Sequence, residues 1–225
     1  SSDLYVTQEH IKNGKAQAII VNSANANTFN GKEGLINAYK MAKFTSDKLN
    51  IKESDVLVAS TGVIGKPLNI DLIEENMDEL VNNLSKQGHI GAREAIMTTD
   101  IIKKEIAVAI MYGDKKITIG GMAKGSGMIH PNMATTLGFI TTDANIDGVL
   151  LKEALKIAVD KSFNRVSVDG DTSTNDMVMI LANGKAKNDR INKKDEHYQV
   201  FLSALTYVCI ELAKLVAKDG EGCTR

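Results

Sequence analysis

Apolar residues recur along the chain at two spacings, and these spacings predict a mixed α/β protein. Intervals of three and four residues separate the apolar positions of four predicted helices, at 33–49, 70–84, 147–163 and 196–217. Short apolar or β-branched runs predict strands at 16–21, 55–59 and 177–182. We expect the apolar stripes of the helices to form the core rather than a binding surface.

A β-hairpin is predicted in the middle of the chain. Glu105–Tyr112 and Lys116–Ile119 have the composition of strands, and they flank the turn residues Gly113 and Asp114. The hairpin adds antiparallel strands to the predicted α/β pattern.

A glycine-rich segment, 120–134, then leads to two adjacent threonines, Thr135 and Thr136, at the start of a predicted strand. Its four glycines permit backbone angles that other residues avoid, and Pro131 fixes one torsion, so a strained turn is expected. Such a turn suits a self-processing site that converts an internal threonine into an N-terminus. The alternatives are an ordinary glycine-rich loop and a phosphate loop. We discount the phosphate loop because Gly-Lys-Ser/Thr at a helix start is absent.

Composition limits the classes of function. The 225 residues are 43% hydrophobic and 24% charged, enough for one large domain or two small ones. The 27 basic and 28 acidic residues form no basic stripe, so nucleic acid and membrane surfaces are not expected partners. No apolar run approaches the roughly 20 residues of a membrane span. We expect a cytoplasmic protein with small-molecule or protein partners.

Neither cysteine is expected to act as a nucleophile. Cys209 lies in an apolar helical pattern that is typical of a buried free thiol, and no histidine is close in sequence to it or to Cys223. The four histidines are too scattered for a metal motif, and no metal is predicted.

The acidic loop 169–176 has alternating oxygen-bearing residues, as a calcium loop does. Ile180 occupies the twelfth position, where a calcium loop has glutamate, so we favour a structural loop.

Six segments of the chain, 21–27, 60–65, 95–100, 121–142, 173–176 and 221–224, resemble in residues and order those of one enzyme family. It is the bifunctional ornithine acetyltransferase / glutamate N-acetyltransferase (ArgJ) family of arginine biosynthesis. The resemblance implies an α/β (α+β) fold of layered sheets and helices, an ArgJ-like and DmpA-like sandwich with an autoprocessed N-terminal threonine. It also implies that the chain is a fragment lacking N- and C-terminal parts. Cys223, Arg225 and Thr136 stand where the family usually has Ala, Lys and Met.

The resemblance implies self-cleavage between Ala134 and Thr135. The cut would divide one intertwined catalytic unit into an α-chain portion, 1–134, and a β-chain portion, 135–225, which assemble as a heterotetramer. The freed amine of Thr135, with a reference pKa of about 7.7 to 8.0, could act as general base for its own hydroxyl.

The implied reaction is a ping-pong transfer of acetyl from N2-acetyl-L-ornithine to Thr135 and then to L-glutamate. Acetyl-CoA is an alternative donor, and no other cofactor is implied. The Thr61 hydroxyl and the Gly62 N–H match the family's oxyanion-hole pair, which stabilises the tetrahedral intermediate.

Three further positions match substrate-binding residues of the family. Lys124 is suited to a substrate carboxylate, and its charge would lower the pKa of the Thr135 amine. Glu221 is suited to the substrate's ammonium group. Either Thr98 or Thr99 should contact substrate, and the match favours Thr98.

Two other functions remain open from the sequence. A self-processing aminopeptidase or amidohydrolase of the related fold would pass the acyl group to water. A non-catalytic fragment would leave the Ala134-Thr135 bond intact.

Overall fold

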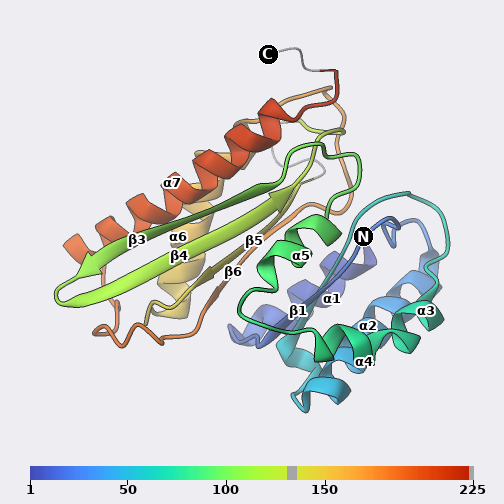
Figure 1. The fold of residues 1–225 in the computed structure, drawn as a ribbon, viewed down its shortest axis with the longest axis horizontal. Helices are drawn as coiled ribbons and strands as arrows, with labels where there is room; N and C mark the ends of the chain where they lie inside the picture. Colours follow the sequence, from blue (N-terminus) through green and yellow to red (C-terminus); the bar gives the residue numbers. More distant parts are fainter. Residues whose placement is uncertain (131–135, 223–225) are drawn as a thin grey trace. The chain divides into compact units, whose positions relative to one another are not determined.

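The computed structural model describes residues 1–130 and 136–222 and divides into two compact units, Ser1–Thr98 (unit 1) and Thr99–Arg225 (unit 2) (Figure 1). The predicted α/β class is confirmed, because both units combine strands with helices. The self-cleavage bond, Ala134-Thr135, lies outside the described residues, so the division into 1–134 and 135–225 stays a prediction.

Unit 1 is built around two parallel strands, β1 (Ala18–Asn22) and β2 (Val56–Ser60), which pair in register from Ala18 opposite Val56 to Asn22 opposite Ser60. Every residue of β2 is buried. The core of the unit is formed by Val56, Val58 and apolar residues of the surrounding helices. The helices of unit 1 are α1 (Ser2–His10), η1 (Ile11–Asn13), α2 (Gly31–Leu49), η2 (Glu53–Asp55), α3 (Ile70–Glu75), α4 (Met77–Asn82) and α5 (His89–Ala95). The buried core residues among them belong to α1, α2, α3 and α4.

The prediction of one helix over 70–84 is wrong, because the segment forms two short helices, α3 and α4, that meet at Asn76. The Asn76 backbone leaves the helical region, and its side-chain amide donates to the Leu72 carbonyl. Asparagine side chains compete with the backbone for hydrogen bonds, and this competition interrupts helices. The apolar spacing continues through the break, so periodicity alone did not reveal it.

Unit 2 contains a four-stranded sheet in the order β3-β4-β5-β6. Its first three strands are antiparallel, while β5 and β6 run parallel. The predicted hairpin is therefore confirmed as β3 and β4. The core lies between this sheet and helices α6 and α7. The elements of unit 2 are β3 (Lys104–Tyr112), β4 (Lys115–Lys124), β5 (Leu137–Thr142), α6 (Gly148–Asp160), η3 (Phe163–Arg165), β6 (Met177–Ala182) and α7 (Glu196–Lys218).

Part of the glycine-rich segment is strand rather than loop. Gly120 and Gly121 belong to β4, which extends to Lys124. A Cβ on Gly121 would lie 3.0 Å from Leu212 Cδ1 and 3.2 Å from Val208 Cγ1, both on α7. The glycine thus lets helix α7 pack close to the sheet, which is a packing role rather than the expected role in a turn.

Helix α7 is the one helix among the described residues with the length and composition of a membrane span. One face of it is buried in the core of unit 2, with Phe201, Leu205 and Leu212 fully inaccessible. A core helix of a soluble domain has these same properties.

Candidate functional site

In unit 1, the candidate region is the turn that follows β2, which contains Thr61 and Gly62. Thr61 is 4% exposed, and its N–H donates to the Asn22 carbonyl at 3.0 Å. The Val63 N–H donates to the Ala24 carbonyl at 3.1 Å. Backbone pairing between the two parallel strands therefore continues into the loops and fixes the turn.

Gly62 has a conformation that suits only glycine. Its φ of 126° is in the region that side chains disfavour, and an added Cβ would lie 2.2 Å from the Ala24 carbonyl carbon. None of the described residues accepts a hydrogen bond from the Gly62 N–H. A fixed N–H with no acceptor can donate to an external oxygen, as an oxyanion hole requires.

In unit 2, the candidate region is the end of β4, where Lys124 is 2% exposed. Burial lowers the pKa of Lys124, and the nearby Lys104 charge lowers it further, whereas the carboxylates of Asp100, Asp176 and Glu221 oppose the shift. Such an ammonium can donate charge-assisted hydrogen bonds to carboxylates of the protein or of a substrate.

Glu221 lies beside the segment that follows Lys124. Its N–H donates to the Ser126 carbonyl at 2.7 Å, and its carboxyl carbon is 2.8 Å from where a Cβ on Gly127 would be. Ser126 also shares a 2.7 Å hydrogen bond between its hydroxyl and that of Thr99. Lys124, Glu221 and Thr99 are therefore brought together around Ser126, although they are far apart in the sequence.

Thr98 and Thr99 fall on opposite sides of the division between the units. Both are exposed. The contact of Thr99 with Ser126 belongs to unit 2, while Thr98, Thr61 and Gly62 belong to unit 1. The choice between the two threonines as substrate contact stays open.

The acidic loop holds both flanks of the segment 131–135. On one side the Asp169 carboxylate accepts the N–H groups of Met128 (2.5 Å) and Ile129 (2.9 Å). On the other side Asp176 accepts the Thr136 N–H at 2.7 Å. Burial alone would raise the pKa of Asp169, but the backbone donors lower it overall. These contacts favour the structural loop over a calcium site.

The sequence interpretation did not assign a role in the site to Asp169 or Asp176. A usable signal was present, because the two aspartates bound a loop that precedes a predicted strand, and aspartate carboxylates commonly accept backbone N–H groups in loops.

The Cys209 thiol is excluded as a nucleophile by its surroundings. It is fully buried, and burial raises its pKa to about 12. A protonated, inaccessible thiol is unreactive. The expectation of a buried free thiol is confirmed, whereas Cys223 lies outside the described residues.

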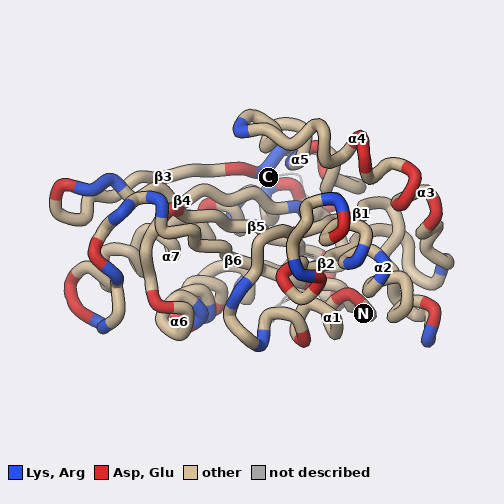
Figure 2. Tube along the Cα trace, turned by 90° about the horizontal axis from the view of Figure 1, so that it is seen from below, with Lys and Arg blue, Asp and Glu red and all other residues tan. Residues whose placement is uncertain are grey.

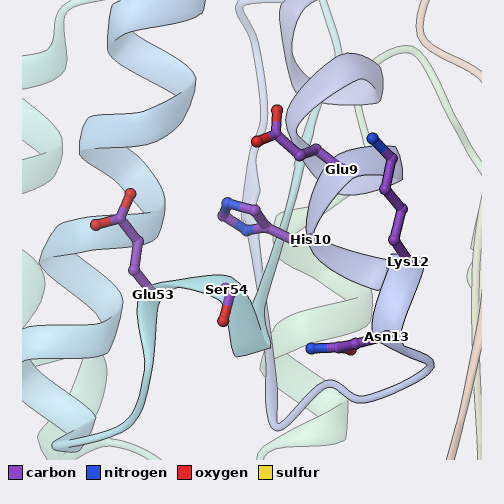
Figure 3. A pocket seen from close by; sticks show the side chains of 6 residues that line it. All are labelled: Glu9, His10, Lys12, Asn13, Glu53 and Ser54. Carbon is purple, nitrogen blue, oxygen red and sulfur yellow. The ribbon is translucent and has the colours of Figure 1, made fainter.

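A hollow at the end of α1 offers no alternative catalytic pair. Figure 3 shows the Ser54 hydroxyl turned away from the His10 ring. The His10 Nδ1 is instead 2.8 Å from the Val56 carbonyl oxygen, and the Glu9 carboxylate accepts the Tyr39 hydroxyl at 2.7 Å. These side chains hold α1 in place.

Charged residues of both signs are spread along the described chain (Figure 2). Figure 2 shows basic and acidic positions interspersed along the described trace, with acidic residues gathered on α3 and α4. Within 1–130 and 136–222, His, Cys, Asp and Glu form no group of three that could hold a metal ion.

Comparison with known proteins gives consistent matches along the whole sequence. The sequence profile of the ArgJ family matches residues 1–225. The arginine biosynthesis bifunctional protein ArgJ of Symbiobacterium thermophilum is 49% identical over 225 residues, all of this chain and 56% of that protein. The protein of the same name from Bacillus licheniformis is 49% identical over 226 residues, 55% of its length. The chain thus spans about half the length of these relatives.

Solved structures extend the likeness to the fold. The arginine biosynthesis bifunctional protein ArgJ of Bacillus halodurans matches with a TM-score of 0.55 and 44% identity, over 60% of this chain and 71% of that one. The ornithine acetyltransferase of Mycobacterium tuberculosis, solved with ornithine, matches with a TM-score of 0.54 and 32% identity, over 60% of this chain and 72% of that one. An aminopeptidase of Ochrobactrum anthropi, described as a variant of the Ntn hydrolase fold, matches with a TM-score of 0.51 and 14% identity, over 80% of this chain and 63% of that one. This match shows a shared fold alone.

Proposed function

The chain belongs to the ArgJ family, and from this premise we propose that the full-length protein is a self-processing acetyltransferase of arginine biosynthesis. It moves acetyl from N2-acetyl-L-ornithine to L-glutamate through Thr135. The relatives' names and the ornithine bound to the Mycobacterium tuberculosis enzyme support the substrate class.

The observation that carries the proposal is the register of β4 and β5. Lys124 pairs with Leu137, which is only two residues after Thr135 in the chain. Lys124 therefore belongs to the end of β4 that pairs with the start of β5, and β5 follows the proposed nucleophile in the sequence. Thr136, the residue after the proposed nucleophile, is fixed by two hydrogen bonds. Its N–H donates to Asp176, and its carbonyl accepts the Met177 N–H at 3.0 Å.

Processing begins when the Thr135 hydroxyl attacks the Ala134 carbonyl. The Ala134-Thr135 peptide bond breaks, the acyl group moves to the hydroxyl oxygen as an ester, and the Thr135 amine takes up a proton. Water then hydrolyses the ester, leaving a carboxylate on Ala134 and a free N-terminal threonine.

In the transfer, the neutral Thr135 amine accepts the proton of its own hydroxyl while the oxygen attacks the acetyl carbonyl. The Gly62 N–H and the Thr61 hydroxyl donate to the oxyanion that forms. Collapse of the intermediate breaks the amide bond, and the leaving amine of ornithine takes the proton. Glutamate's amine then attacks the acetyl ester by the same steps and regenerates Thr135.

Substrate charges find complementary groups in unit 2. Lys124 pairs with the α-carboxylate, and Glu221 accepts hydrogen bonds from an ammonium group of the substrate. Acetyl-CoA as a second donor, a heterotetramer of processed chains and a cytoplasmic location are further parts of the proposal, which family membership supports.

Two measurements on the full-length protein test the proposal. N-terminal sequencing should find a chain that begins Thr-Thr-Leu-Gly-Phe, and Thr135→Ala should abolish the cut while Thr136→Ala permits it. A chain beginning at Thr136, or loss of cutting only in Thr136→Ala, would move the nucleophile by one residue.

The second measurement follows acetyl groups. Processed protein supplied with N-acetylornithine should form N-acetylglutamate when glutamate is present. Acetate release at one rate with and without glutamate would instead identify a hydrolase. An uncut protein with neither product would identify a non-catalytic chain.

A further inference from the structure

Three charged residues of unit 2 are buried together. Lys104 Nζ lies 2.7 Å from Asp100 Oδ1 and 2.5 Å from Asp219 Oδ2. The side chains of Lys104, Asp100 and Asp219 are 0%, 0% and 2% exposed. Removing such charges from water costs several kcal/mol each, so a buried cluster of this kind needs complete hydrogen bonding to persist.

Both carboxylates accept backbone N–H groups as well as the Lys104 ammonium. Asp219, directly after α7, accepts the N–H groups of Ile101 and Ile102 at 3.0 to 3.2 Å in addition to the Lys104 ammonium. Asp100 accepts the Gly125 N–H at 2.7 Å. Lys104 therefore links three segments, the approach to β3, the exit from β4 and the end of α7.

Each of these segments carries a residue of the candidate site. Lys124 directly precedes Gly125, and Glu221 is two residues after Asp219. Thr99 directly precedes Asp100, and its hydroxyl contacts Ser126. The buried cluster consequently fixes the backbone beside Lys124 and Glu221, the proposed substrate-binding residues, and beside Thr99, which contacts Ser126.

We propose that Lys104 is a positioning residue of the acyl-transfer site, whose ammonium joins Asp100 to Asp219 and so holds Lys124 and Glu221 at the spacing of the substrate's carboxylate and ammonium groups. This inference rests on the proposed function. It assigns Lys104 no contact with substrate.

The cluster also sets the electrostatic surroundings of Lys124. Lys104 and its partner carboxylates carry a net charge of −1 beside Lys124, and Asp176 and Glu221 face Lys124 from other segments. Without the Lys104 charge, the carboxylates of Asp100 and Asp219 lose their partner, and Lys124 is the nearest cation that remains in this group. The ammonium of Lys124 is then drawn toward Asp100 and away from substrate, and its pKa rises.

The test uses the full-length processed protein with Lys104→Met, which keeps the length of the side chain and removes its charge. We expect KM for N-acetylornithine and for glutamate to rise about 10- to 100-fold, the range for a lost hydrogen bond between charged groups. The alkaline limb of kcat/KM should move to higher pH. Adding Asp219→Asn to Lys104→Met restores the net charge of the cluster and should recover part of both changes.

A control matched for stability is Leu205→Ala, a truncation in the core face of α7. It should lower the unfolding temperature by a comparable amount and leave KM and the pH limb unchanged. If Lys104→Met shows only this pattern, the residue is merely structural and the proposal is overturned.

If Lys104→Met does not fold, Asp219→Asn alone can replace it in the test, because the asparagine amide oxygen still accepts backbone N–H groups. Folded Asp219→Asn with wild-type KM and pH limb would equally overturn the proposal. Absence of transfer in the wild-type protein would contradict the proposed function before any variant is made, so the two failures are distinguishable.

Discussion

The two candidate regions, one in each unit, are stabilised by different forces. The turn at Thr61 and Gly62 is held by backbone hydrogen bonds between parallel strands and by a glycine that approaches Ala24 closely. The end of β4 is held by buried charges, with Lys124 and Lys104 among carboxylates. One part depends on shape, the other on charge.

The difference has a consequence for how each part responds to change. A backbone N–H donates equally at any pH, so the turn should tolerate pH and salt but no added atom. An ammonium works only while protonated, so the end of β4 should respond to pH and to any neutralised partner.

Gly62→Ala should have the largest effect. The new methyl group would lie 2.2 Å from the backbone of Ala24, so the turn must move and the N–H loses its direction. We expect kcat to fall about 100- to 1000-fold, as for removal of one oxyanion donor. Steady-state assays of processed protein at several pH values measure this loss, which should be the same at each pH.

Gly65→Ala is the matched control for the turn. Gly65 also has a positive φ, 77°, but no atom lies within 4 Å of its added Cβ. This variant should have a small stability loss of about 1 kcal/mol and nearly normal kcat. Equal losses in the two variants would show that strain in the loop, rather than the donor, limits activity.

Lys124→Gln should have the next largest effect, and this effect should depend on pH. Loss of a buried charge-assisted hydrogen bond predicts a fall of about 10- to 100-fold in kcat/KM. The wild-type alkaline limb should lie below the ordinary lysine pKa of about 10.4, since burial lowers the pKa of Lys124, and it should vanish in the variant. The acid limb, assigned to the Thr135 amine, should move to higher pH without the neighbouring cation.

Lys116→Gln, an exposed change on the same strand, is the control and should keep both limbs. If Lys124→Gln kept the wild-type pH profile, the end of β4 would not depend on charge, and the contrast with the turn at Thr61 and Gly62 would be wrong.

Asp176→Ala should slow processing about 10-fold, because Thr136 loses an N–H acceptor at 2.7 Å next to the proposed cleavage bond. Asp176→Asn keeps an acceptor oxygen and should fall between this variant and the wild type. The time course of chain cleavage on gels measures the rate, with exposed Asp171→Ala as control. Wild-type cleavage in Asp176→Ala would mean that the loop plays no part in processing.

Strongly periodic elements could be predicted from the sequence. Helices α2, α6 and α7 and strands β1, β2 and β6 lie within a few residues of their predicted ranges, because alternating or helical apolar spacing reports burial directly. Helix α1 was missed because its buried face is mostly polar. It presents Asp3, Val6, Thr7 and His10.

Polar side chains of α1 hydrogen-bond to the backbone of β2, as a neighbouring strand would. The Thr7 hydroxyl donates to the Val58 carbonyl at 2.7 Å and accepts the Val58 N–H at 2.8 Å, while His10 contacts the Val56 carbonyl. Such side-chain pairing at the edge of β2 leaves no hydrophobic signal in the sequence.

The candidate site was only partly predictable for a similar reason. Thr61, Gly62, Lys124 and Glu221 were found through motif resemblance, which does not identify their supports. Lys104 did carry a signal, because it occupies the inward face of β3 in alternation with Ile106 and Val108. A lysine at such a position predicts a buried, paired ammonium, but only the fold identifies partners from residues 100 and 219.

Asp3→Asn should have the smallest effect on activity, because it changes stability alone, and it probes a strongly shifted acid of unit 1. Burial raises the pKa of Asp3 to about 6, although hydrogen bonds from Ser60 and Asn27 oppose the shift. A raised pKa favours the protonated form in the folded state. The associated stability is therefore fully present below pH 3.8, the unfolded value, and is lost as pH rises through about 6.

Denaturant unfolding of the wild type should accordingly show a decline on the order of 3 kcal/mol between about pH 4 and pH 7, the size expected for a two-unit shift. Asp3→Asn should lack this decline, because its amide stays neutral and can still accept the Asn27 hydrogen bond that Asp3 accepts at 2.6 Å. Since Ser60 directly precedes Thr61, a simultaneous change in kcat would show that this carboxyl also influences the turn. A change in stability with constant kcat would leave the turn dependent on shape alone.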